Sequence, residues 1–193
     1  AEARSLVSQV RIQTGATIRA EGPARTDGRK RSWWVSYRLD VPQNSSLALE
    51  STNGGIHLAG VEGDIQFTTT NGGLHLKDVG GRVSGRTTNG GVHLDLDGSE
   101  WRGEGLELVT TNGGVHVNVP RGYNARLEVG TTNGRVHGAV AGASAEEEED
   151  EDDAEARRKR RHRGRKNLNV VLGSGGRLLR IRTTNGGVHV NEG

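Results

Sequence analysis

The sequence contains no cysteine and no methionine, and its aromatic residues are three Trp, two Tyr and one Phe among 193 residues. The absence of cysteine excludes disulfides and thiolate metal sites. Because a primary translation product begins with methionine, we expect a processed chain or a fragment, and we favour removal of a signal peptide over removal of an initiator residue alone. No apolar run approaches the length that crosses a bilayer, so we expect no membrane insertion.

The charges are nearly balanced, with 26 basic and 24 acidic residues and a formal net charge of +2. Such a balance gives no long-range field that would attract a polyanion, so we predict no nucleic-acid partner. Thirty-one glycines and few aromatic residues leave little material for a bulky globular core.

One phrase, Thr-Thr-Asn-Gly-Gly-Val-His with small variations, occurs six times. The asparagines of the six phrases are Asn53, Asn71, Asn89, Asn112, Asn133 and Asn185. Subtraction gives spacings of 18 (71−53), 18 (89−71), 23 (112−89), 21 (133−112) and 52 (185−133) residues. A fixed period with insertions is typical of stacked structural units whose extra residues form loops.

The 18-residue period divides into two nines, and each nine has an apolar residue at its third position. These residues are Leu47, Ile56, Ile65, Leu74, Val83 and Val92. The fifth position is usually apolar as well, and this alternation predicts a half-buried strand. We expect each nine to form one strand and one turn. Asn-Gly-Gly would be the turn, because glycine accepts positive φ without steric cost.

We therefore predict an all-β protein, a single-chain β-solenoid with coils of about 18 residues, two short strands per coil and about 4.8 Å between copies. Asn-Gly is also typical of antiparallel hairpins, so a stack of hairpins is the alternative. Because identical phrases recur in the same chain direction at every second strand, the solenoid accounts better for the pattern.

Four segments follow from this interpretation: an N-terminal β cap (1–43), regular coils (44–142), a charged insertion (143–167) and a final coil (168–193). The cap is expected to contain strands at 5–13, 16–20 and 33–41, with Trp33, Trp34 and Tyr37 as its anchor. A sugar-binding aromatic platform is the weaker interpretation of these residues.

Smaller insertions each carry an aromatic residue, Trp101 or Tyr123, which either contacts a ligand or seals a bulge. The charged insertion holds nine acidic residues in Glu146–Glu155 and eight basic ones in Arg157–Lys166. A cation-binding loop and a basic arm are the functional interpretations, and a self-neutralising solvated insert is the preferred one.

One histidine follows the inward apolar residue of every phrase, so the six should point outward in a single column. They are His57, His75, His93, His116, His137 and His189. A metal-binding ladder is the sharper hypothesis, but a straight column brings two ligands to a point where a tight site needs three or four. We prefer a structural stack of imidazoles that loosens as pH falls through about 6, because neighbouring imidazolium ions repel. The asparagines should form a parallel, structural ladder of side-chain hydrogen bonds.

The last phrase ends only a few residues before Gly193, so the sequence predicts an open strand edge formed by Val188, His189, Val190 and Asn191. Exposed edges accept strands from other chains. We therefore expect end-to-end self-association into fibres or a surface layer.

The sequence resembles the bacterial putative-adhesin family of β-strand-repeat domains in Val41-Pro42, the Thr-Asn-Gly-Gly phrases, Val61-Glu62-Gly63, Val79-Gly80-Gly81 and Val119-Pro120-Arg121-Gly122. The resemblance covers the chain outside the charged insertion. It implies an exported, envelope-associated β-solenoid of largely unknown function, and it supplies no catalytic residues. We predict no cofactor and no metal site.

The sequence as a whole predicts a non-catalytic structural or adhesive element of the cell surface. A glycan- or metal-binding module that uses the outward His/Thr face is the first alternative, with envelope glycan as the partner. A polysaccharide-degrading enzyme is more remote, because Asp95 and Asp97 are the only close acidic pair in the regular coils.

Overall fold

The computed structural model describes residues 11–13, 18–21, 35–139 and 166–193, and every regular element within them is a β-strand. The all-β prediction is therefore confirmed for this part of the chain. The chain forms two compact units, residues 1–40 and residues 41–193, which are described separately.

The first unit contains a short antiparallel pair, β1 (Arg11–Gln13) and β2 (Arg19–Glu21). The strand predicted at 33–41 is wrong where it can be followed, because residues 35–41 have no strand structure. Among the described residues no strand pairs with this segment, so alternating apolar residues alone do not make it a strand. Tyr37 is 46% exposed and anchors no core, while Trp33 and Trp34 lie outside the described residues.

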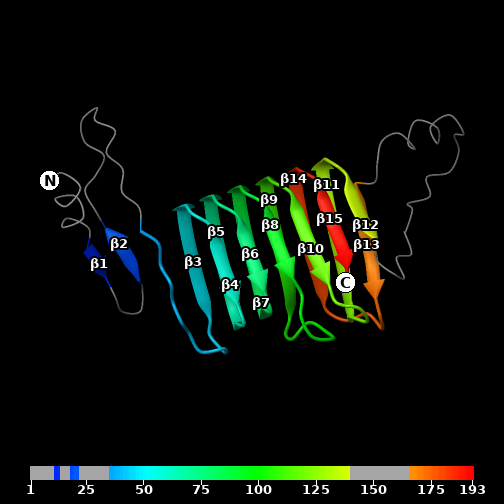
Figure 1. Cartoon of the computed structure of the whole chain (residues 1–193), viewed down its shortest axis with the longest axis horizontal. Coiled ribbons are helices and arrows are strands. Elements are labelled where there is room, and N and C mark those ends of the chain that lie inside the picture. The colour runs from blue at the N-terminus through cyan, green and yellow to red at the C-terminus, as the bar shows by residue number, and fades with distance from the viewer. Residues whose placement is uncertain (1–10, 14–17, 22–34, 140–165) are drawn as a thin grey trace, which may run out of the picture. The chain divides into compact units, whose positions relative to one another are not determined.

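The second unit consists of two sheets (Figure 1). The first, which we call the long-strand sheet, has in spatial order β3 (Leu47–Asn53), β5 (Glu62–Asn71), β7 (Gly80–Asn89), β9 (Gly105–Asn112), β14 (Leu178–Asn185), β11 (Ala125–Asn133) and β13 (Asn167–Leu172). The second, the short-strand sheet, has β4 (Ile56–Ala59), β6 (Leu74–Lys77), β8 (Val92–Asp95), β10 (Val115–Val119), β15 (Val188–Glu192) and β12 (Val136–Ala139). All neighbours are parallel except β11 and β13.

Each phrase joins one long strand to one short strand, and we number these pairs repeats 1 to 6 in chain order. Neighbouring repeats pair in the register of the phrase. Asn53 lies opposite Asn71 in the long-strand sheet, and His57 lies opposite His75 in the short-strand sheet. Residues one sequence period apart are therefore register partners on neighbouring strands.

The inward side chains of both sheets form one hydrophobic core. Ile65 and Leu74, both at predicted inward positions, are fully buried. Gly85 interrupts the apolar series because the ring of Phe67 in the neighbouring repeat occupies its space. A Cβ on Gly85 would lie 1.9 Å from the Phe67 ring. The bulky residue in one repeat and the missing side chain in the next are therefore complementary.

The stacking order departs from the chain order at the C-terminal end. Repeats 1 to 4 stack in sequence, but repeat 6 lies between repeats 4 and 5. Strand β15 pairs with β10 on one side and with β12 on the other, so the predicted open edge at Val188, His189, Val190 and Asn191 is wrong. Because repeat 6 carries the same phrase as repeats 4 and 5, β15 pairs in register with the short strands of both. Both edges of β15 are therefore hydrogen-bonded within the sheet.

The two aromatic residues of the smaller insertions seal the core. Trp101 is 5% exposed and donates its indole N–H to the Gly81 carbonyl at 3.0 Å. Tyr123 is 3% exposed, and burial raises its pKa to about 12. The hypothesis that these residues contact a ligand is therefore wrong. The charged insertion lies outside the described residues apart from Lys166 and Asn167, and Asn167 begins β13.

Candidate ligand-binding face

The first glycine of each phrase lies where neighbouring repeats approach most closely. A Cβ on Gly72, Gly90, Gly113 or Gly186 would lie 2.1 Å from the carbonyl oxygen of the equivalent glycine in the repeat stacked before it, for example Gly54 for Gly72. The phrase glycines are not among the residues with positive φ, so the predicted reason for the turn glycines is wrong. Close approach of the backbones, rather than left-handed conformation, requires this glycine.

In four of the six phrases the second glycine lies beneath the imidazole two residues later. A Cβ on Gly73 would be 3.7 Å from His75 Nε2, and a Cβ on Gly187 would be 3.6 Å from His189 Nε2. These are ordinary contact distances, so a side chain is tolerated at these two positions, whereas a Cβ on Gly55 or Gly91 would lie 3.1 or 3.2 Å from a backbone carbonyl oxygen. The fifth phrase has Arg135 at this position.

The first threonine of the phrase points inward and ties the turns together. Thr87 Oγ1 donates to the Gly72 carbonyl at 2.9 Å, and Thr110 Oγ1 donates to the Gly90 carbonyl at 2.8 Å. The same bond recurs in the other repeats through Thr69, Thr131 and Thr183. These hydroxyls are buried, and each satisfies a carbonyl that the turn would otherwise leave without a partner.

The six asparagines form one continuous column along the turn edge. Each amide Nδ2 donates to the Oδ1 of the next asparagine at 2.8 or 2.9 Å, in the order Asn133, Asn185, Asn112, Asn89, Asn71 and Asn53. The column passes through repeat 6 without a break, although that repeat is out of chain order.

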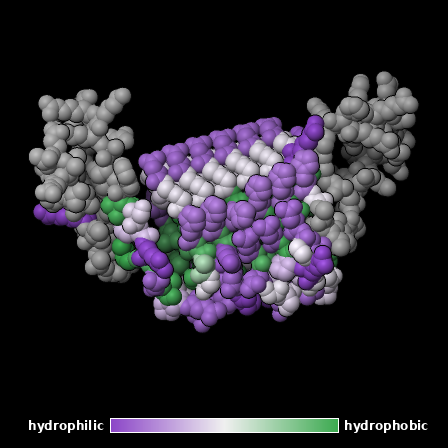
Figure 2. Space-filling model, in the orientation of Figure 1, coloured by the Kyte–Doolittle hydropathy of each residue, from purple (hydrophilic) through white to green (hydrophobic). Residues whose placement is uncertain are grey.

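The six histidines form a second column on the outward side of the short-strand sheet. Neighbouring ring centroids are 4.5 to 5.9 Å apart, and the rings are within 8° to 24° of parallel, in the order His57, His75, His93, His116, His189 and His137. Burial, followed by the charges of His57 and His93, lowers the pKa of His75, while Asp95 opposes this shift. Figure 2 shows continuous hydrophilic rows on this side of the molecule.

The sequence interpretation missed a shorter column beside the histidines, two residues further along the same strands. Lys77, Asp95, Asn118 and Asn191 lie in register here. Asn118 Nδ2 donates to Asp95 Oδ1 at 2.6 Å, and Asp95 Oδ1 is 3.4 Å from His93 Nε2. The two-residue strand period, extended by one step, would have placed these side chains on the same face.

This arrangement does not suit a tight metal site. Because the rings are nearly parallel, their nitrogen lone pairs lie in separate parallel planes and do not converge on one centre. Within the described residues, no group of three or more His, Cys, Asp or Glu side chains could hold a metal ion.

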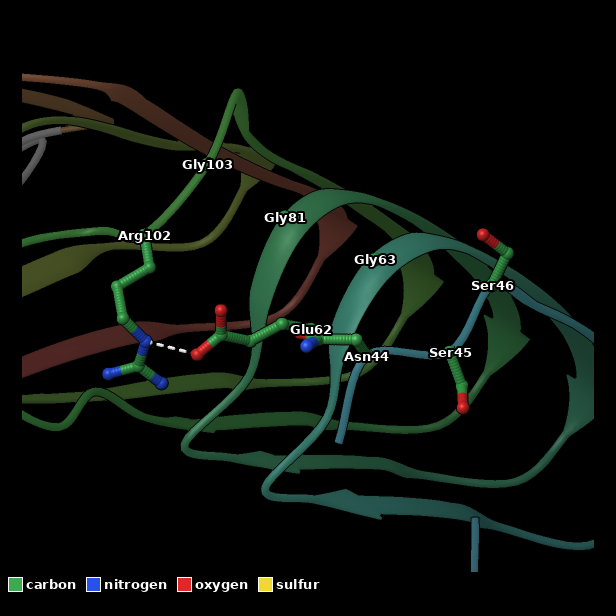
Figure 3. A pocket seen from close by; sticks show the side chains of 8 residues that line it. All are labelled: Asn44, Ser45, Ser46, Glu62, Gly63, Gly81, Arg102 and Gly103. Carbon is green, nitrogen blue, oxygen red and sulfur yellow. Dashed lines mark hydrogen bonds and ion pairs between the residues drawn. The ribbon is translucent and has the colours of Figure 1, made fainter. Parts of the chain in front are cut away.

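A pocket of about 430 Å³ lies away from the columns, where the insertion after β8 folds back over the strand ends (Figure 3). Its lining residues are Asn44, Ser45, Ser46, Glu62, Gly63, Gly81, Arg102 and Gly103. The Arg102 guanidinium binds Asp78 at 2.6 Å and also binds Glu62. Hydrogen bonds to these two carboxylates raise the Arg102 pKa. The guanidinium charge is therefore paired with Asp78 and Glu62, and these ion pairs hold the insertion against the strand ends.

No protein-family model matches the chain, and neither a curated protein nor a solved structure gives a match. The likeness to the bacterial adhesin-type repeat family therefore stays a prediction from the sequence phrases. Within the described residues, no helix is long and apolar enough to cross a membrane.

Proposed function

We propose that the two sheets are the two sides of a β-solenoid in which each repeat makes one coil. The parallel pairing of equivalent strands supports this, as does the turn that leads from each long strand to a short one. The antiparallel β13 closes one edge of the long-strand sheet, beyond β11.

We propose that this protein is a non-catalytic structural or adhesive element of a bacterial cell surface. The observation that carries the proposal is the unbroken repetition of the histidine and asparagine columns across six repeats. A catalytic centre is a single asymmetric grouping of side chains, whereas the His and Asn groups of this face are copied from repeat to repeat at the strand spacing of about 4.8 Å. Such a surface is suited to a partner that is itself periodic, because weak contacts at several equivalent positions add up to avidity.

An exported location and an envelope polysaccharide as partner belong to the same proposal. Its sequence support is the resemblance to the adhesin-type family. Its structural support is that the insertions holding Trp101 and Tyr123 connect strands at the end of the repeat opposite the phrase, which leaves the polar columns uninterrupted.

The test is retention of the purified protein on insoluble cell-wall polysaccharide. A triple variant, His75→Ala, His93→Ala and His116→Ala, removes three adjacent rings and should weaken retention by roughly tenfold or more. The matched control replaces three outward residues in register on the long-strand sheet, Gln66→Ala, Ser84→Ala and Glu107→Ala. Equal loss of retention in both triple variants, with the β-sheet circular dichroism intact, would exclude the histidine face as the binding surface.

Metal binding is the second candidate for the same face. A stoichiometric zinc or copper isotherm that disappears in the His75→Ala, His93→Ala double variant would support it. The parallel rings lead us to expect no such isotherm.

Self-association also belongs to the proposal, although it cannot use the strand that the sequence pointed to. The outer strands of the repeat stack are β3 and β4 at one end and β13 and β12 at the other. Strand β13 lacks the phrase, so the Asn and Thr columns would stop at a contact formed there. The position of repeat 6 suggests a different mode of association.

A further inference from the structure

Repeat 6 fills a slot between two parts of the chain that are neighbours in sequence. Strand β14 pairs with β9 on one side and β11 on the other, and β15 does the same with β10 and β12. Leu179, Ile181 and Val188 are fully buried there. Without repeat 6, four strands would have an unpaired edge and the core would be open between repeats 4 and 5.

The charges on the outward side of the slot match repeat 6. Arg180 of β14 lies in register between Glu107 of β9 and Glu128 of β11, and its Nε is 2.9 Å from Glu128 Oε2. If β11 paired directly with β9 in the register of the phrase, the two glutamates would be neighbours and would repel each other. The slot between repeats 4 and 5 is therefore complementary to this repeat.

The C-terminal segment 167–193 makes its strand pairs with repeats 4 and 5 alone among the described residues. Strands β13 and β14 lie on either side of β11, and the loop between them passes over Asn124. Ser174 donates its backbone N–H and its hydroxyl to Asn124 Oδ1 at 2.8 and 3.0 Å. The segment therefore binds as one unit.

The link between this unit and the rest of the chain is long. Strand β12 ends at Ala139 and β13 begins at Asn167, which leaves 27 residues between them (166−139). A chain of that length can span at most about 90 Å. The link therefore permits the unit to reach a slot other than that of its own molecule.

We infer that residues 167–193 are an exchangeable element, and that the slot of one copy accepts this element from a second copy of the chain. This inference rests on the self-association part of the proposed function and gives it a mode. Every strand pair in the exchanged assembly is one that already exists in the single chain, so exchange costs no native contact. The high effective concentration of the tethered element favours the closed monomer in dilute solution. Refolding at high protein concentration favours exchange.

The test uses pairs of cysteines introduced into the full chain, which has no cysteine of its own. The slot variant, Asn118→Cys with Asn191→Cys, joins β10 to β15, and the two positions lie in register. Register partners on paired strands are about 4.8 Å apart, within the range that a disulfide spans. The matched control variant, Asp95→Cys with Asn118→Cys, joins β8 to β10 within the repeats stacked in chain order.

Each variant is unfolded, refolded at low and at high protein concentration, oxidised, and separated on a non-reducing gel. We expect disulfide-linked dimers and larger species from the slot variant at high concentration, while the control variant links within one chain at both concentrations. Only intramolecular links in the slot variant at every concentration would overturn exchange. If the slot variant gives only intramolecular links but light scattering still detects association, exchange is wrong, and the protein self-associates through the ends of its sheets instead.

Discussion

Repeats 1 to 4 and repeats 5 and 6 use the same phrase, but they stack in different orders. In the first group each repeat pairs with the next one in the chain, whereas in the second group repeat 6 separates repeats 4 and 5. The Asn and His columns cross both groups without interruption. The phrase therefore determines the register between neighbours, while residues outside the phrase determine which repeats become neighbours.

Replacing the first glycine of a phrase with alanine should cause the largest loss of stability. The same replacement in repeat 2 and in repeat 6 compares the packing of the two groups of repeats. Gly72→Ala in repeat 2 and Gly186→Ala in repeat 6 each bring a Cβ to 2.1 Å from a backbone carbonyl oxygen. The contacted backbone cannot move aside without separating the strands. For both variants we therefore expect a loss of about 3 kcal/mol or more in the free energy of unfolding. Urea denaturation measures the loss.

The control for each variant is alanine at the adjacent second glycine. Gly73→Ala and Gly187→Ala place the Cβ at 3.4 Å or more from its neighbours, and Arg135 already occupies the equivalent position in repeat 5. We expect losses below about 1 kcal/mol. A tolerated Gly186→Ala together with a damaging Gly72→Ala would mean that repeat 6 packs less tightly than the repeats stacked in chain order.

The Phe67–Gly85 pair gives the next largest effect and lies entirely in the group stacked in chain order. Gly85→Ala puts a methyl group into the Phe67 ring and should cost about 2–3 kcal/mol. The double variant Phe67→Leu, Gly85→Ala should recover much of that loss, because leucine vacates the ring space. A double-mutant cycle measures the coupling, and additive losses would show that the two residues do not share one volume.

Reversing the charge at Arg180 tests what determines the order of the repeats. Arg180→Glu would place three glutamates in register on β9, β14 and β11, and we expect a loss of about 1–2 kcal/mol. Arg86→Glu is the control, since its register partners are Thr68 and Val109, and it should cost less than about 0.5 kcal/mol. Added salt should reduce the difference between the two variants. Equal losses would remove the charge argument for the position of repeat 6.

Much of this fold follows from the sequence because its information is periodic. An 18-residue spacing with inward residues such as Ile65 and Val83 specifies parallel strands and the register between them. The stacking order of the repeats could not be predicted from the sequence. Repeat 6 carries the same phrase as the others, so the phrase alone allows it to pair with any other repeat. An outward column formed by Glu107, Arg180 and Glu128 distinguishes the slot, and the members of this column are far apart in sequence.

The candidate binding face was partly predictable for the same reason. The outward direction of the histidines follows from strand alternation, and the regular strand spacing brings them into one column. The requirement for the first phrase glycine was assigned to the wrong cause, because turn chemistry is a local argument. The close approach involves another repeat, as between Gly72 and Gly54, and only the packed structure contains it.

The smallest predicted effect is the pH dependence of the histidine column in the group stacked in chain order. Burial and the neighbouring His57 and His93 lower the pKa of His75, so the folded protein favours its neutral form. The unfolded chain takes up this proton first as pH falls below about 6.5, and the stabilisation present above that pH is lost as pH falls through the lower pKa of the folded protein. Lys77 and Asp95 lie beside the column, and of these Asp95 opposes the shift.

NMR titration of the His75 ring gives its pKa, and urea denaturation between about pH 7.5 and pH 5 gives the stability. His75→Gln should flatten the pH dependence, whereas a His75 pKa at or above 6.5 would mean that burial and the neighbouring imidazoles do not outweigh the opposing charge of Asp95.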